Sequence, residues 1–170
     1  MADCLWCGIA AGKIQSIKVY EDDSFIAVLD INPANPGQVV VTTKKHAKDI
    51  RELSPSETGK LFSIVRSVTI ALTQSLGCEG VNAVYSLGTL AGQRSDHLIV
   101  YVVPRFKDDK VIINWEPKQV EPEKLVALGA KVAEAIKSVP VVVSAPQPKV
   151  IHEKIVDEKV IKRKPRVPVY

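Results

Sequence analysis

The stretch G-Q-R-S-D-H-L-I-V-Y-V-V-P-R, residues 92–105, decides the fold. It passes from a glycine turn into an unbroken apolar run that ends at Pro104. Because side chains alternate across a β-strand, His97, Ile99 and Tyr101 are expected on one face, with the apolar residues between them on the other. Both faces are then largely apolar, which predicts a strand buried on both sides in the interior of a sheet.

The rest of the chain supplies further strands by the same kind of pattern. Runs rich in β-branched and aromatic residues, each bounded by turn residues, predict strands at 18–22, 25–29, 38–43, 80–87 and 96–103. The first two are separated by Asp-Asp-Ser and predict a hairpin. A single helical turn is expected before them, at residues 9–13.

Two longer helices are predicted. Ser54, Pro55 and Glu57 form a helix start in which Ser54 is the N-cap and Glu57 completes a capping box. Apolar residues then recur every three or four positions, and Gly77 can end the helix. Residues 122–138 repeat the amphipathic pattern. This order of elements predicts an α+β domain, a mostly antiparallel sheet with two main helices.

Composition divides the chain of 170 residues into two parts. Residues 1–138 are expected to form one domain, and residues 139–170 a basic C-terminal extension rich in Pro, Val and Lys. The last thirty residues carry seven basic and three acidic side chains, which account for the whole net charge of +4. A basic end of this kind can contact RNA or an acidic protein partner, but more often it is simply solvated.

The remaining bulk properties indicate the cellular environment in which the protein is expected. The chain is 46% hydrophobic and 25% charged, which is typical of globular proteins. No apolar run approaches the ~20 residues that span a bilayer, so no membrane association is expected. The N-terminus lacks the basic start and long apolar stretch of a secretory signal. These features predict a cytoplasmic protein.

The central stretch resembles the signature strand of the histidine-triad (HIT) family of nucleotide hydrolases and transferases. That family has His-x-His-x-His followed by apolar residues, often after Gly-Gln and before Pro-Arg. Here Gly-Gln at 92–93, His97 and Pro-Arg at 104–105 match, whereas Ile99 and Tyr101 occupy the second and third triad positions. The order of elements from residue 4 to about 137 is also similar. The resemblance implies a HIT-like fold and a homodimer formed through the long helix and a strand.

The catalytic positions of the family are changed. In the family the middle histidine attacks the nucleotide's α-phosphoryl group, and isoleucine has no lone pair for that reaction. Gln38 stands where a histidine supports the nucleophile, and Tyr101 replaces the last triad histidine. The resemblance therefore implies a degenerate member with no catalytic residue retained at Gln38, Ile99 and Tyr101. Whether the protein is an enzyme stays open, and the losses favour a protein that is not.

A metal site is the feature that the resemblance leaves intact. In similar family members a structural zinc is held by a Cys-x-x-Cys pair, the histidine after the Pro-Gly loop and the first triad histidine. The corresponding residues here are Cys4, Cys7, His46 and His97. Two thiolates and two imidazoles suit a closed tetrahedral zinc site. The alternative is a reduced cysteine pair, a surface His46 and a core His97. Cys78 is expected to be a small buried residue and not a ligand.

A purine nucleotide is the ligand that the resemblance implies. An aspartate at the end of the second strand holds the ribose in the family, and Asp30 occupies that place. Gln93 matches a glutamine that contacts phosphate, and Ser86 stands where an asparagine often assists. Asp30 and Gln93 also have simpler interpretations, as a turn aspartate before Asn-Pro and as a polar residue at a strand start.

Three functions follow from these observations. The leading hypothesis is a non-catalytic, zinc-stabilised homodimer that acts as a binding or scaffold module and retains nucleotide binding. The second is a phosphoramidate or dinucleotide hydrolase with an altered site, in which Tyr101 would be the nucleophile. The third is a nucleic-acid or ribonucleoprotein factor that acts through the basic residues 162–166 of the extension.

Overall fold

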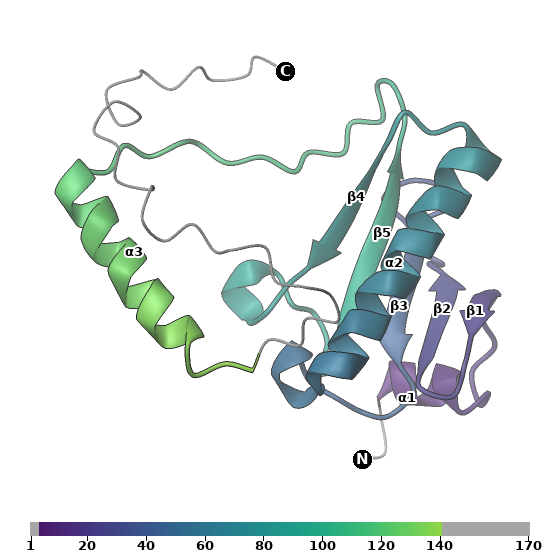
Figure 1. Cartoon of the computed structure of the whole chain (residues 1–170). Coiled ribbons are helices and arrows are strands. Elements are labelled where there is room, and N and C mark those ends of the chain that lie inside the picture. The colour runs from purple at the N-terminus through teal and green to yellow at the C-terminus, as the bar shows by residue number, and fades with distance from the viewer. Residues whose placement is uncertain (1–3, 141–170) are drawn as a thin grey trace. The chain divides into compact units, whose positions relative to one another are not determined.

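The computed structural model describes residues 4–140, drawn in colour in Figure 1. The chain separates into two compact units, one up to Ile113 and one from Asn114 onward. The hypothesis of an RNA or protein partner depends on the C-terminal extension. From residue 141 onward, this extension lies outside the described residues. The boundary expected after residue 138 stays a prediction.

The first unit is built on one antiparallel sheet. Its strands are β1 (Lys18–Glu21), β2 (Phe25–Leu29), β3 (Val39–Thr43), β4 (Gly80–Tyr85) and β5 (Ile99–Arg105). They are arranged in the order β1-β2-β3-β5-β4, and every neighbouring pair is antiparallel. The predicted α+β class is confirmed, and β5 is an interior strand, as its apolar faces predicted.

The two faces of β5 belong to two different clusters. Val100 and Val102 lie in the larger cluster, beneath the long helix α2 (Pro55–Leu76) that crosses one face of the sheet (Figure 1). Ile99 and Tyr101 lie in the smaller cluster, on the opposite face. The predicted alternation is confirmed. The strand continues through Pro104 because its pairing with β3 ends at Val102, so that the proline has one strand neighbour only.

Helix α2 begins and ends as predicted. The Ser54 hydroxyl accepts a hydrogen bond from the Glu57 backbone N–H at 3.2 Å, and the Glu57 carboxylate accepts one from the Ser54 N–H at 2.8 Å. Gly77 ends the helix with φ +61°, a conformation that glycine adopts without strain. The helix buries one apolar stripe, made of Leu61, Ile64, Val65, Val68 and Leu72.

The first helix differs from its prediction. Helix α1 spans Leu5–Ala10 and follows Cys4 directly, instead of forming a turn at residues 9–13. Its inward residues are Ile9 and Trp6, which pack on the smaller cluster. The segment is too short for its apolar spacing to show in sequence, and its first turn lies between the two cysteines of the Cys-x-x-Cys pair.

The second unit contains helix α3, Pro122–Ile136, close to its predicted bounds. The apolar residues that define its predicted face are all exposed: Leu125, Leu128, Val132 and Ile136. No helix within residues 4–140 is long and apolar enough to cross a membrane.

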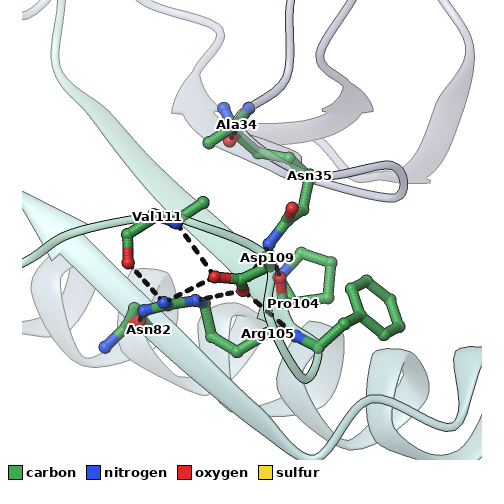
Figure 2. Close-up of polar contacts among 9 residues, drawn as sticks. Ala34, Asn35, Asn82, Pro104, Arg105, Asp109 and Val111 are labelled. Carbon is green, nitrogen blue, oxygen red and sulfur yellow. Dashed lines mark hydrogen bonds and ion pairs between the residues drawn. The ribbon is translucent and has the colours of Figure 1, made fainter.

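A polar network ties the loop between β2 and β3 to the end of β5 (Figure 2). The buried amide of Asn35 donates to the Pro104 carbonyl and to the Asp109 carboxylate, both at 2.8 Å. Arg105 donates to the same carboxylate at 2.7 Å and 2.9 Å, and its guanidinium holds the pKa of Asp109 well below the usual range. The loop at residues 30–38 is thereby fixed against the central strand.

Candidate metal centre and the pockets beside it

Four candidate metal ligands converge at one end of the sheet. Cys4 and Cys7 come from the start of α1, His46 follows β3, and His97 precedes β5. Their ligand atoms all lie within 4.8 Å of one another. The Nδ1 atom of His97 lies 3.2 Å from the Sγ of Cys4 and 3.6 Å from that of Cys7, and Nδ1 of His46 lies 3.3 Å from Cys7 Sγ. Three segments distant in sequence thus present two sulfurs and two nitrogens to one point.

The spacing of these atoms fits tetrahedral zinc. With Zn–S of ~2.3 Å and Zn–N of ~2.1 Å, the sulfur–nitrogen edge of a tetrahedron is about 3.6 Å. The Nε2 atom of His97 lies 2.9 Å from the Thr43 carbonyl and 3.0 Å from the Thr43 hydroxyl. A proton on Nε2 donated to that carbonyl leaves the Nδ1 lone pair facing the sulfurs, which is the orientation a metal requires.

The protonation of the cluster depends on its burial. His97 is fully buried, and burial lowers the pKa of its imidazole, so the ring is neutral at pH 7. Burial also raises the pKa of the Cys7 thiol, and the neighbouring Cys4 raises it further. A bound divalent cation opposes that effect, because it coordinates thiolates. Cys78 lies apart from these residues, in the cluster beneath α2, as the sequence predicted.

Ile99, which the family resemblance places at the nucleophile's position, lies in packed apolar surface. Ile99 is 8% exposed and belongs to the smaller cluster, against which Trp6 and Tyr101 pack. Burial and the charge of Asp30 raise the pKa of Tyr101, and the charge of Arg94 offsets this in part. The Tyr101 phenol is therefore protonated at neutral pH.

Gln38, predicted from the resemblance to replace a supporting histidine, has a structural part in this chain. Its side chain is buried, and its amide donates to Asp30 Oδ2 at 2.6 Å while its carbonyl accepts from the Ala34 N–H at 2.9 Å. The other oxygen of Asp30 accepts from the Asn32 N–H at 2.9 Å. Gln38 thus braces the loop and fixes the orientation of the Asp30 carboxylate.

The three residues predicted to bind nucleotide are not joined to each other by any hydrogen bond within the described chain. The Gln93 amide donates to the carbonyls of Lys48 and Ser95 at 3.0 Å and 2.9 Å, and its oxygen accepts from the Gly88 N–H at 2.7 Å. Both amide hydrogens of Gln93 are therefore committed, one within its own loop and one to the segment after β3 that contains Lys48. Ser86 is partly buried and directly follows β4.

One pocket lies beside the Asp30 loop. It measures about 480 Å³ and is lined by Ile14, Ile17 and Ile31, with Ser16 among them. The Ser16 hydroxyl is buried and has no hydrogen-bond partner in the part of the chain that the structure describes. This pocket was not predicted from the sequence; the signal was a set of isoleucines isolated among polar residues.

A second pocket, also about 480 Å³, adjoins the metal cluster. Trp6, Ile99 and Tyr101 line its apolar part, and Arg94 and Asp96 are among its polar residues. The cluster residues Cys4 and His46 form part of its wall. Trp6 and Arg94 were not predicted from the sequence; a large aromatic residue between two candidate metal ligands was the available signal.

Comparison with known proteins agrees with this fold. The HIT domain family model matches residues 11–108, a segment that includes both cluster histidines but neither Cys4 nor Cys7. Adenosine 5'-monophosphoramidase of Schizosaccharomyces pombe is 30% identical over 135 residues, 79% of this chain and 98% of that protein.

Solved structures give the same result. A Streptococcus mutans protein superposes with a TM-score of 0.75 at 33% identity, over 80% of this chain and 87% of that one. A zinc-bound histidine triad family protein from Mycobacterium smegmatis gives 0.61 at 29% identity, over 78% and 97%. Because the family model covers more than half of the sequence and the relatives match over nearly their full lengths, this chain belongs to the histidine-triad (HIT) family.

Proposed function

We propose that this protein is a non-catalytic HIT module that binds ligands or partners on a fold stabilised by structural zinc. The observation that carries the proposal is the state of position 99. The family's nucleophile is replaced there by an isoleucine that is 8% exposed and packed beneath Trp6. Nothing at that position can attack phosphorus, and Ile99 packs with the apolar residues of the smaller cluster.

Zinc is the metal that best fits the cluster. Cys4, Cys7, His46 and His97 would supply all four ligands, which leaves no open coordination position for a substrate or water. The zinc would cross-link the start of α1 to the segment that follows β3 and to the segment that precedes β5. The zinc-bound relative from Mycobacterium smegmatis supports this assignment.

Hydrolysis through Tyr101 has less support. The S. pombe relative is named as a phosphoramidase, so hydrolysis on a related chain is available for comparison. A tyrosine nucleophile needs a base that lowers its phenol pKa, whereas burial and Asp30 raise the pKa of Tyr101. Asp30, the nearby carboxylate, is held by Gln38.

Nucleotide binding would be retained through the nucleoside and not through the phosphate. The isoleucine-lined pocket beside the Asp30 loop suits a purine base. Gln93 has no free amide hydrogen for a phosphate oxygen. Adenosine and AMP are therefore expected to bind with affinities within about threefold of each other, measured by calorimetry.

A homodimer is part of the proposal. β4 is an edge strand with one neighbour, and such edges pair readily with another chain. The outer side of α2 exposes Phe62 and Ile70. A second copy that covers the edge and these side chains would extend the sheet. Light scattering on the full chain should give twice the mass of one chain, and Phe62→Arg should shift that mass toward the monomer.

The central experiment combines metal content with turnover on one preparation. We expect about one zinc per chain and no hydrolysis of adenosine phosphoramidate or a diadenosine substrate above background. Hydrolysis within about tenfold of an active HIT hydrolase assayed in parallel would refute the non-catalytic role. Zinc far below one per chain after purification without chelator would refute the structural metal.

A further inference from the structure

The pocket between Trp6 and Arg94 adjoins the metal cluster and has no assigned ligand. We propose that it binds a small aromatic monocarboxylate, with the ring on Trp6 and Ile99 and the carboxylate on Arg94. The inference rests on the proposed non-catalytic role, because Ile99 and Tyr101, which line the pocket, occupy two of the triad positions.

The apolar part of the pocket suits a planar ring. Trp6 and Tyr101 both pack on the cluster that buries Ile99, so their rings are held in place and not free in solvent. The volume of about 480 Å³ lies within the range of small-molecule sites. Aromatic rings pack favourably on one another in offset or edge-to-face arrangements. A bicyclic ring would cover this surface.

The polar part of the pocket presents donors. Within residues 4–140 no hydrogen bond or ion pair engages Arg94, even though Asp96 lines the same pocket. The Tyr101 hydroxyl is likewise without a hydrogen-bond partner in that range. A guanidinium binds a carboxylate through two parallel N–H donors, and a phenol can donate a third hydrogen bond. The ligand group opposite them must accept hydrogen bonds.

The charges near the pocket limit the negative charge that a ligand can carry there. Asp96 lines the same pocket as Arg94, and Asp30 lies close enough to Tyr101 to affect its titration. A zinc with two thiolates and two neutral imidazoles would add no net charge. The desolvation cost of an anion rises steeply with its charge, and Arg94 is the one arginine that lines the pocket, so a carboxylate with a single charge is favoured over a phosphate dianion.

The test is a titration of the full-length, zinc-loaded protein with 2-naphthoate. The chain has two tryptophans, and Trp115 is 78% exposed, so Trp115→Phe leaves Trp6 as the reporter. Quenching of Trp6 fluorescence and calorimetry should give the same dissociation constant. In this background Arg94→Gln should weaken binding by at least about tenfold, since a hydrogen-bonded charge pair is lost.

Matched controls separate this site from adventitious binding. Arg66→Gln removes an exposed arginine from α2, which crosses the other face of the sheet, and should leave the dissociation constant unchanged. The uncharged 2-naphthamide should bind at least about tenfold more weakly, and millimolar inorganic phosphate should not compete.

Four results would overturn the inference: no detectable binding of 2-naphthoate, a smaller effect of Arg94→Gln than stated, amide binding less than about tenfold weaker, or competition by inorganic phosphate. The last would indicate a phosphate site. Arg94 is exposed, so its substitution should not affect folding, and an unchanged melting temperature checks this. Zinc content and hydrolysis, measured on the same samples, report separately on the proposed function.

Discussion

The row of side chains that starts at His97 divides into two regions of opposite character. At its beginning, His97 meets Cys4, Cys7 and His46 with all four donor atoms within 4.8 Å. Two residues further along, Ile99 occupies the place of a nucleophile and packs in a hydrophobic cluster. The first region has four side chains that can donate electron pairs to a metal and so cross-link the chain. The second has an isoleucine, which has no electron pair for a nucleophilic attack. The difference predicts that the stability of the fold depends on the four metal-cluster residues and not on the residues at the triad positions.

Substituting a cysteine of the metal cluster should have the largest effect on stability. Cys7→Ser is expected to abolish zinc binding and to lower the free energy of unfolding by at least ~5 kcal/mol, because zinc binding in small domains is worth ~10–16 kcal/mol and is coupled to folding. Elemental analysis and thermal melting measure the two effects. Cys78→Ala is the control: this cysteine lies beneath α2, so zinc should stay bound. A Cys7→Ser protein that melts like the wild type would show that the four donors are incidental to stability.

Substituting Ile99 should destabilise the fold less than substituting Cys7, and it should not restore hydrolysis. Ile99→His places a polar ring in an apolar cluster beneath Trp6, which should destabilise the fold by about 2–3 kcal/mol. Adenosine phosphoramidate hydrolysis should stay at the wild-type background, because Gln38 and Tyr101 give the new imidazole no orienting partner. A rise of more than about 100-fold would mean that the site lacks only its nucleophile.

The sequence predicted the elements that local chemistry determines. Ser54, Glu57 and Gly77 encode the two ends of α2 within a few residues each, and the alternation on β5 needs no distant partner to be recognised. The cluster of four donors required the family resemblance, because its members lie up to 93 residues apart. With the resemblance, the sequence analysis named the same four residues that the structure brings together.

Other features could not be predicted because they depend on which groups form hydrogen bonds with each other in the folded chain. Gln93 matches a phosphate-contacting position, yet its amide is used by Lys48 and Ser95. Gln38 stands out in the sequence only as a lost histidine, whereas its bonds to Asp30 and Ala34 give it a bracing part. The pocket of Trp6 and Arg94 joins two segments that no local pattern connects.

A variant in the polar network that holds the loop between β2 and β3 tests stability without changing the metal cluster or the residues at the triad positions. Asn35→Ala removes the buried donor shared by the Pro104 carbonyl and Asp109, leaving the carbonyl unpaired (Figure 2). The expected loss is about 1–2 kcal/mol in chemical denaturation, with zinc content unchanged. Asn32→Ala, on the exposed part of the same loop, should change stability by less than about 0.5 kcal/mol. Equal losses in both variants would show that the network does not hold the loop.

The smallest effect on the fold is expected from removing the extension. A chain ending at Ser138 keeps every helix and strand within residues 4–140, since α3 ends at Ile136, and it keeps all four metal ligands. Its melting temperature should therefore lie within about 2 °C of the full chain, with zinc still bound. The extension carries the whole net charge, so a partner that it recruits should be lost on truncation and weakened by salt in the intact chain. Parallel pull-downs at low and high salt measure this. A truncated chain that fails to fold, or that keeps every partner, would show that the extension belongs to the domain or has no part in association.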